Sequence, residues 1–268
     1  MEILEYRGVE GLVAAEVLSD DASGISFGTP FPVAGVAQLT KSTDSSNEAH
    51  YYDNIPAVVI ASNGSDTVTI NVSAIPLDVV AKLTGQTYDS TKGAMVEGIR
   101  AVRYFAIGYK TQKSNGDTMY VWRYKGTFAV PDEEANTIDN STSANGQTLV
   151  YTGISTTYAF SNGGRAKALV VDGGENKADV SAFFTAVTTP DSVTGNTSYT
   201  LTITQANNTT VTVVRHGVAL ANNAVIYAGD ELKITVTGGT VKVNNVAFTS
   251  GDIHVVTGAT AVVSTASA

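Results

Sequence analysis

Two neighbouring stretches decide the fold: residues 99–109, Ile-Arg-Ala-Val-Arg-Tyr-Phe-Ala-Ile-Gly-Tyr, and residues 119–130, Met-Tyr-Val-Trp-Arg-Tyr-Lys-Gly-Thr-Phe-Ala-Val. Aromatic and β-branched residues dominate both, as is typical of strands in a half-buried sheet. Ser114-Asn115-Gly116-Asp117 lies between them, and Asn-Gly favours a hairpin turn because both residues tolerate positive φ. The sequence therefore predicts a central antiparallel hairpin, with one face packed under a helix.

The composition supports a β protein and excludes several classes of function. Only 15% of the 268 residues are charged, while Gly, Thr, Ser, Asn and Val are abundant, which indicates many short strands and turns. The net charge of −9 disfavours non-specific binding to nucleic acid or acidic membranes. Disulfides and thiolate metal sites are excluded because the chain has no cysteine.

No targeting segment is expected. The first residues are charged and lack the apolar core of a signal peptide, so we expect a product that is cytosolic when made. No apolar run reaches the roughly 18 residues that a membrane-spanning helix needs.

The first part of the chain predicts several strands, at residues 25–32, 33–40, 57–60 and 67–72. Residues 8–18 suit either a helix or a strand by periodicity, and we favour a strand because the next stretch reads as its short partner. A polar stretch without periodicity, residues 41–48, interrupts them, and we interpret it as a long loop or an extended arm. Asn63-Gly64-Ser65-Asp66 is interpreted as a turn.

Two short helices are expected. Residues 76–84 predict the first, because Pro76 suits a helix start and Gly85 suits its C-terminal cap. Residues 175–187 predict the second, since apolar side chains recur there at helical spacing. These apolar residues are Val180, Phe183, Phe184 and Val187.

From about residue 191 the aromatic residues almost vanish and short strands alternate with turns. The expected strands are residues 198–204, 209–215, 224–228, 231–237, 240–243, 252–256 and 260–264. Strands at this spacing predict a small β-sandwich. We therefore expect two domains, residues 1–190 and 191–268, with a linker near residues 189–195.

Residues 1–190 resemble the major tail proteins, or tail tube proteins, of long-tailed bacteriophages, especially the phi13-type group. The resemblance is carried by Ala74-Ile75-Pro76-Leu77-Asp78-Val79, Leu83-Thr84-Gly85-Gln86-Thr87-Tyr88-Asp89, Tyr104-Phe105-Ala106-Ile107-Gly108-Tyr109, Ser114-Asn115-Gly116, Tyr120-Val121-Trp122-Arg123-Tyr124-Lys125-Gly126-Thr127-Phe128, Pro131-Asp132-Glu133-Glu134-Ala135-Asn136-Thr137 and Phe183-Phe184-Thr185-Ala186-Val187. Residues 192–268 are similar to bacterial Ig-like modules through residues 226–232 and 238–244.

The resemblance implies a mainly β fold: a tail-tube β-sandwich or barrel with one or two short flanking helices, plus a C-terminal Ig-like β-sandwich. It also implies a virion protein, assembled in the host cytoplasm, in which six copies form a ring. Stacked rings form the tube through which DNA is ejected, without specific DNA binding. Implied partners are further copies, the tape measure protein inside the tube, and the distal tail and tail terminator proteins at its ends.

Family members contact neighbouring subunits through a long arm between two early strands. The matching positions here are about residues 41–54. The arm residues are Lys41, Ser42, Thr43, Asp44, Ser45, Ser46, Asn47, Glu48, His50, Tyr51, Tyr52 and Asp53. Residues 1–190 hold 13 basic and 21 acidic residues, a net charge of −8, which suits a lumen that repels DNA phosphates.

Alternation along residues 119–126 predicts two unlike faces. Tyr120, Trp122, Tyr124 and Gly126 point one way, and Met119, Val121, Arg123 and Lys125 point the other. One face is expected under the helix at residues 76–84. The other is expected against the lumen or a neighbouring copy.

No enzymatic site, cofactor or metal is expected. His50, His216 and His254 lie in separate segments, and no HExxH, GxSxG, Walker or GxGxxG pattern occurs. Asp132-Glu133-Glu134 suits either a Ca²⁺ site or a solvated turn, and we favour the turn. Asp172-Gly173-Gly174 is interpreted as a helix-entry turn, because no lysine follows at the spacing of a phosphate loop.

Two alternatives stay open at this point. Tyr51, Tyr52 and Tyr88 suit either stacking on sugars or bases, or burial in a core or subunit interface, which we favour because no basic residues accompany them. For the whole chain, the alternative function is a cell-surface or carbohydrate-binding module carried by the Ig-like domain.

Overall fold

The computed structural model describes residues 3–133 and 146–267, with the backbone alone for residues 60–63. The chain forms two compact units. The large unit consists of residues 5–171 and 180–193; the small unit consists of residues 172–179 and 194–267, together with residues 3–4. The fold is mainly β, as the sequence predicts, and the described residues contain one α-helix.

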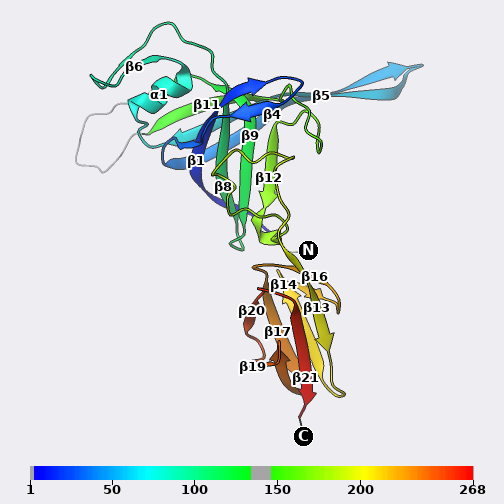
Figure 1. Cartoon of the computed structure of the whole chain (residues 1–268). Helices are drawn as coiled ribbons and strands as arrows, with labels where there is room; N and C mark the ends of the chain where they lie inside the picture. Colours follow the sequence, from blue (N-terminus) through cyan, green and yellow to red (C-terminus); the bar gives the residue numbers. More distant parts are fainter. Residues whose placement is uncertain (1–2, 134–145, 268) are drawn as a thin grey trace, which may run out of the picture. The chain divides into compact units, whose positions relative to one another are not determined.

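One large sheet organises the large unit (Figure 1). Its strand order is β2 (Ile25–Phe27), β1 (Tyr6–Asp20), β8 (Phe105–Lys113), β9 (Thr118–Phe128), β11 (Gln147–Ile154), β5 (Ile55–Val72) and β4 (Val36–Tyr52). Shorter strands extend it: β3 (Phe31–Pro32) pairs with β1, β10 (Asp132–Glu133) with β11, and β12 (Ala168–Asp172) with β9. A separate hairpin joins β6 (Thr87–Asp89) to β7 (Ala94–Val96).

The central hairpin is β8 and β9, and its turn lies where the sequence predicts it, although Gly116 has a positive φ and Asn115 does not. Gly116 has a φ of 93°, and the Lys113 N–H donates to the Asp117 carbonyl at 2.8 Å. The start of the first strand was predicted wrongly. Residues 99–104 lie outside any strand, and β8 begins at Phe105.

Both faces of this sheet are covered by the chain itself, so the prediction that one face is left for a lumen or a neighbour is wrong for Trp122 and Tyr124. These two side chains are fully buried with Phe160 and Phe183. Val121 belongs to a separate core on the opposite face. That second core also includes Val80 and Leu83 of the predicted helix.

A β-bulge changes which face β9 presents near its end. Phe105 pairs with Gly126 whereas Ile107 pairs with Arg123, so β9 carries one extra residue. Since strand side chains alternate, that residue turns Phe128 onto the helix-side core. Strict alternation along β9 would instead place Phe128 on the same face of the sheet as Trp122.

The first predicted helix is confirmed as α1 (Leu77–Thr84), beginning one residue after Pro76. Gly85 ends it in the left-handed region, with a φ of 71°. A Cβ at this position would lie 1.9 Å from the Ala101 carbonyl oxygen, so only glycine fits. Leu83 is buried against the sheet, while Leu77 is exposed.

The second predicted helix is wrong. A short 3₁₀ turn, η1 (Gly173–Glu175), precedes a series of turns through residue 187. Trp122 Nε1 and Thr188 Oγ1 both donate to the Phe183 carbonyl, at 2.9 and 3.0 Å. The helical spacing of Phe183 and Val187 therefore reflects burial against the Trp122 face.

The small unit is a sandwich of two sheets around one core, as predicted. One sheet runs β16 (Val225–Tyr227), β13 (Ser198–Thr204), β21 (Thr260–Ala266), β18 (Gly239–Val243), β19 (Val246–Phe248). The other runs β15 (Val218–Leu220), β14 (Thr210–Arg215), β17 (Glu231–Thr237), β20 (Ile253–Val255). All seven predicted strands are confirmed to within a few residues, and the structure adds two three-residue strands, β15 and β19, that the sequence does not predict.

A buried carboxylate connects residues 172–179 to this sandwich. Asp230 is fully buried and accepts hydrogen bonds from Arg215 Nη1 at 2.7 Å and Asn176 Nδ2 at 3.2 Å. Asn196 Nδ2 adds bonds to the carbonyls of Asn176 and Ala228. The small unit thus includes a segment that precedes the expected linker.

Candidate functional site

A two-stranded ribbon projects from the edge of the large sheet (Figure 1, pale blue). β11 pairs with β5 from Val72 to Asp66 only. Beyond this point β4 and β5 continue to pair with each other, from Ser45–Asn63 to Tyr52–Ile55. We call residues 44–63 the arm; its eight paired positions at about 3.3 Å each give a reach of about 26 Å.

The tip of the arm is a tight hairpin turn. Asp53 and Asn54 have φ values of 51° and 65°, both in the left-handed region. A two-residue turn with positive φ at both positions matches the right-handed twist of the flanking strands. Pro56 follows, and its missing N–H is tolerated because the strand lies at an edge.

The arm leaves the sheet at a β-bulge. Thr43 pairs with Asp66, whereas Ser45 pairs with Asn63, so the β5 side carries one extra residue. A Cβ on Gly64 would lie 2.4 Å from the Asp44 carbonyl oxygen, which leaves room only for glycine. Bulges bend a strand and increase its twist, so this one sets the direction of the arm.

A buried ion cluster lies at the same place. Asp66 accepts a hydrogen bond from Arg123 Nη1 at 2.8 Å, and Lys167 Nζ lies 3.3 Å from its other oxygen. Lys167 also donates to the Gly64 carbonyl, and Arg123 Nε donates to the Tyr109 hydroxyl at 3.3 Å. The cluster therefore links the bulge to both β9 and the segment before β12.

Charge keeps Asp66 ionised despite its burial. Burial alone would raise the pKa of this carboxyl, but the hydrogen bonds it accepts and the positive charges of Lys41 and Lys167 lower it below its ordinary value. Burial raises the pKa of the neighbouring Tyr151 hydroxyl, which donates to the Phe105 carbonyl at 3.0 Å. Both groups thus hold fixed charge states near neutral pH.

The arm exposes apolar side chains on both of its faces. Tyr51, Tyr52, Ile55, Val58 and Val59 are each exposed by half or more. Consecutive residues of a strand point to opposite faces, so neither face of the ribbon is covered. A lone two-stranded ribbon is marginally stable in water, and its free edges can pair with another strand.

The arm is acidic. Residues 44–63 contain Asp44, Glu48 and Asp53 and neither lysine nor arginine. All three acidic residues are exposed. A partner for the arm must therefore accept apolar side chains and negative charge together.

The structure places the expected arm residues in two groups. Lys41, Ser42 and Thr43 belong to the body of the sheet, where β4 pairs with residues 66–68. The others lie on the arm: Asp44, Ser45, Ser46, Asn47, Glu48, His50, Tyr51 and Tyr52 on β4, and Asp53 in the turn. Residues 41–48 are therefore strand, and the loop interpretation is wrong.

The returning strand of the arm is predicted only in part. The strand expected at residues 57–60 is confirmed, but the turn expected at residues 63–66 is wrong, because β5 runs through them without a break in pairing direction. The actual turn, Asp53-Asn54, carries the residue types that favour positive φ. Ile55, Val58 and Val59 thus belong to the same exposed surface as Tyr51 and Tyr52.

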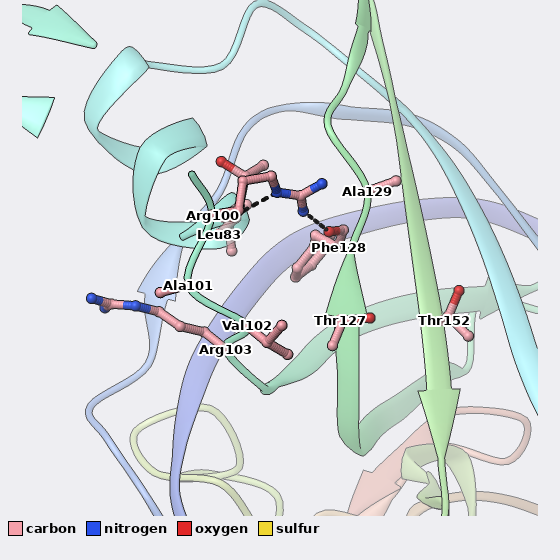
Figure 2. Close-up of a pocket in the computed structure, with 10 residues that line it drawn as sticks. Leu83, Arg100, Ala101, Val102, Arg103, Thr127, Phe128, Ala129 and Thr152 are labelled. Carbon is pink, nitrogen blue, oxygen red and sulfur yellow. Dashed lines mark hydrogen bonds between the residues drawn. The ribbon is translucent and has the colours of Figure 1, made fainter. Parts of the chain in front are cut away.

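A groove of about 380 Å³ lies elsewhere on the large unit, between the end of α1 and the end of β9 (Figure 2). Its lining residues are Leu83, Thr84, Arg100, Ala101, Val102, Arg103, Thr127, Phe128, Ala129 and Thr152. Figure 2 shows the Arg100 guanidinium bridging two elements, with Nε donating to the Thr84 carbonyl at 3.0 Å and Nη2 to the Phe128 carbonyl at 2.9 Å.

The groove is lined by two arginines and by an exposed apolar residue, Val102, which is 77% exposed. Ile99, which precedes Arg100 in the chain, is 100% exposed but is not one of the lining residues. Arg103 pairs with Glu16 at 3.5 Å on the surface. None of the ten lining residues is acidic.

The histidines considered as candidate catalytic residues are not brought together by the fold. His50 lies on the arm, His216 in a turn with a φ of 49°, and His254 on β20. Within the described part of the chain, no three His, Asp or Glu side chains are grouped to hold a metal ion. Asp132 and Glu133 form the short strand β10, and Glu134 lies outside the described residues.

Comparison with protein-family models gives no match, and comparison with curated protein sequences gives none either. Among residues 3–133 and 146–267, no helix is long and apolar enough to cross a membrane. The proposed function rests on the two surfaces described above, the arm and the groove.

Proposed function

We propose that this chain is a structural subunit that assembles with copies of itself into stacked rings, forming the tail tube of a bacteriophage through which DNA is ejected. The observation that supports this most is the arm. A ribbon with uncovered apolar faces and free edges is suited to a partner that covers it.

The position of the arm favours ring formation. The arm projects from one edge of the large sheet, and we take its partner surface on another copy to be a different patch. A contact between two unlike patches is heterologous, and it closes into a ring when the rotation between copies closes. Stacking of the rings repeats this kind of contact, between two unlike patches, along the tube axis.

The charge of the chain suits a conduit for DNA. A net charge of −9 repels phosphates, which would let a duplex pass without being held. The resemblance of residues 1–190 to tail tube proteins supports the same proposal. From the same resemblance we propose the tape measure, distal tail and tail terminator proteins as partners of this chain, and the virion as its location.

Electron microscopy of the purified full-length chain tests this function. We expect rings or tubes of constant diameter in negative stain as the protein concentration is raised. A variant in which Asn-Gly replaces residues 46–62 should stay folded and monomeric, because it keeps the Ser45–Asn63 pair and loses only the arm. Val246→Ser, on the small unit, is the matched control and should assemble.

The opposite result would favour the alternative function. A wild-type chain that stays monomeric at every concentration and binds cell-wall glycans would point to a carbohydrate-binding module in the small unit. Tubes of normal length from the armless variant would overturn the role of the arm.

A further inference from the structure

We infer that the arm of one copy docks into the groove of the next copy, so that residues 44–63 and the ten groove residues form one head-to-tail interface. This inference rests on the proposed self-assembly and names the surface that receives the arm. Four features of the two surfaces support it: apolar exposure, charge, aromatic content and position.

The first feature is apolar exposure on both sides. The arm offers Ile55, Val58 and Val59, and the groove offers Val102. Burial of an apolar side chain such as Val102, which is 77% exposed, is favourable. Contact between the two surfaces would cover the exposed apolar residues of both.

The second feature is opposite charge. The arm carries Asp44, Glu48 and Asp53 and no basic residue, while the groove is lined by Arg100 and Arg103 and no acidic residue. Because Arg103 already pairs with Glu16 at 3.5 Å, the uncompensated charge of the groove is chiefly that of Arg100. Arg100 gives two of its donors to backbone carbonyls, which are neutral, so its positive charge stays uncompensated by these bonds. Opposite potentials favour encounter and fix the orientation of docking.

The third feature is the pair of exposed tyrosines near the arm tip. Tyr51 and Tyr52 have no ring partner among the described aromatic contacts. Arginine guanidinium groups stack on tyrosine rings, and tyrosine is enriched at interface centres. The groove volume of about 380 Å³ lies within the roughly 300–1,000 Å³ of sites that hold small organic groups.

The fourth feature is position within one copy. Figure 1 shows the arm extending from the sheet away from α1, which borders the groove. The bulge at Gly64 and the Asp66 cluster hold the base of the arm, so its tip does not fold back onto its own groove. The groove that receives it must belong to another copy.

Cysteine cross-linking tests the interface directly, because the chain has no cysteine of its own. The test variant combines Tyr52→Cys with Val102→Cys in the full-length chain. The control variant combines Tyr52→Cys with Val170→Cys, since Val170 is also exposed, on β12 of the same unit. Both are oxidised under assembling conditions and separated on a denaturing gel without reductant.

The test variant should give a ladder of covalent oligomers. We expect at least about tenfold more trimer and higher species than in the control, because docking holds the two thiols at a high effective concentration. Adding Arg103→Glu should shrink this ladder, and adding Glu48→Lys to that variant should restore part of it.

The possible failures are distinguishable. Regular tubes in the electron microscope together with equal, weak ladders in both variants would overturn the groove as the receiving surface and leave the proposed tube intact. Absence of both tubes and ladders would overturn the self-assembly as well.

Discussion

Arg123 donates a hydrogen bond to Asp66 at 2.8 Å at the point where the arm leaves the large sheet. Arg123 belongs to the central hairpin and Asp66 to the strand that becomes the arm, so this contact ties the projecting ribbon to the middle of the core. Both side chains are at most a tenth exposed. The base of the arm is therefore held firmly while its tip is left uncovered.

Asp66→Asn should destabilise the large unit by about 3 kcal/mol, because Arg123 and Lys167 would keep their charges in a buried site without a carboxylate. Urea unfolding followed by the fluorescence of Trp122, the only tryptophan, reports on this unit alone. Glu10→Gln, at an exposed position on β1, is the control and should leave the midpoint unchanged. An Asp66→Asn chain as stable as the wild type would show that the ion cluster contributes nothing to the free energy of unfolding of the large unit.

The stability of the large unit should fall in acid. The pKa of Asp66 is lowered by its hydrogen bonds and neighbouring lysines against the effect of burial. The pKa of Asp20 is likewise lowered, because its bonds from Lys125, Thr157 N–H and Tyr158 N–H outweigh burial.

A carboxyl whose folded pKa is depressed stabilises the fold above its unfolded pKa, here 3.8, and loses that contribution as the pH falls through the folded value. We therefore expect a constant free energy of unfolding from pH 7 to about pH 5 and a decline below about pH 4. Asp66→Asn should flatten the decline. An equally steep decline in that variant would assign the acid sensitivity to other groups.

Gly64→Ala should distort the base of the arm. The new Cβ would lie 2.4 Å from the Asp44 carbonyl oxygen, which is backbone and cannot move aside cheaply. We expect a cost of about 1–3 kcal/mol and a higher protein concentration for assembly. Gly24→Ala, where a Cβ meets no atom within 4 Å, is the control for both readouts.

Trp122→Phe should loosen the segment at residues 180–187. The indole donates to the Phe183 carbonyl at 2.9 Å and fills the core beneath Phe184. Losing this bond and part of the packing should cost about 2 kcal/mol, measured by urea unfolding with circular dichroism. Tyr6→Phe, at an exposed ring, should have no such effect.

A chain ending at residue 193 should still form tubes, because the arm, the groove and both cores of the large unit are retained. A chain ending at residue 171 should not, since it loses Phe183 and Val187 from the core around Trp122. Negative-stain micrographs of both chains decide this. Failure of the 193-residue chain to assemble, despite a native circular dichroism spectrum, would place the small unit in the tube wall.

The sequence was most informative where local chemistry determines local structure. Asn115-Gly116 predicted the central turn, and Pro76 and Gly85 marked the ends of α1. The regular spacing of turns after about residue 191 predicted seven strands of the small sandwich. In each case the residues that determine the local structure are close together in the sequence.

Prediction from the sequence failed where burial produced helical spacing without a helix, and where exposure of both strand faces removed the alternation of a strand. Phe183 and Val187 have helical spacing because both pack on the Trp122 face, and the Phe183 carbonyl is bound by the side chains of Trp122 and Thr188 instead of by a helix. Polar residues 45–48 gave no strand pattern because both faces of the arm are exposed, which removes the alternation that burial imposes.

The sequence by itself therefore determined the β class, the central hairpin, α1, the strands of the small unit and the stretch from which a projecting arm emerges. Only the tertiary structure decided that residues 44–63 form one ribbon, that Asp66, Arg123 and Lys167 meet at its base, and that Arg100 and Arg103 line a groove. The physical reason is distance along the chain. Turns and caps depend on adjacent residues, whereas an ion cluster joining residues 66, 123 and 167 exists only after three separate segments have packed together.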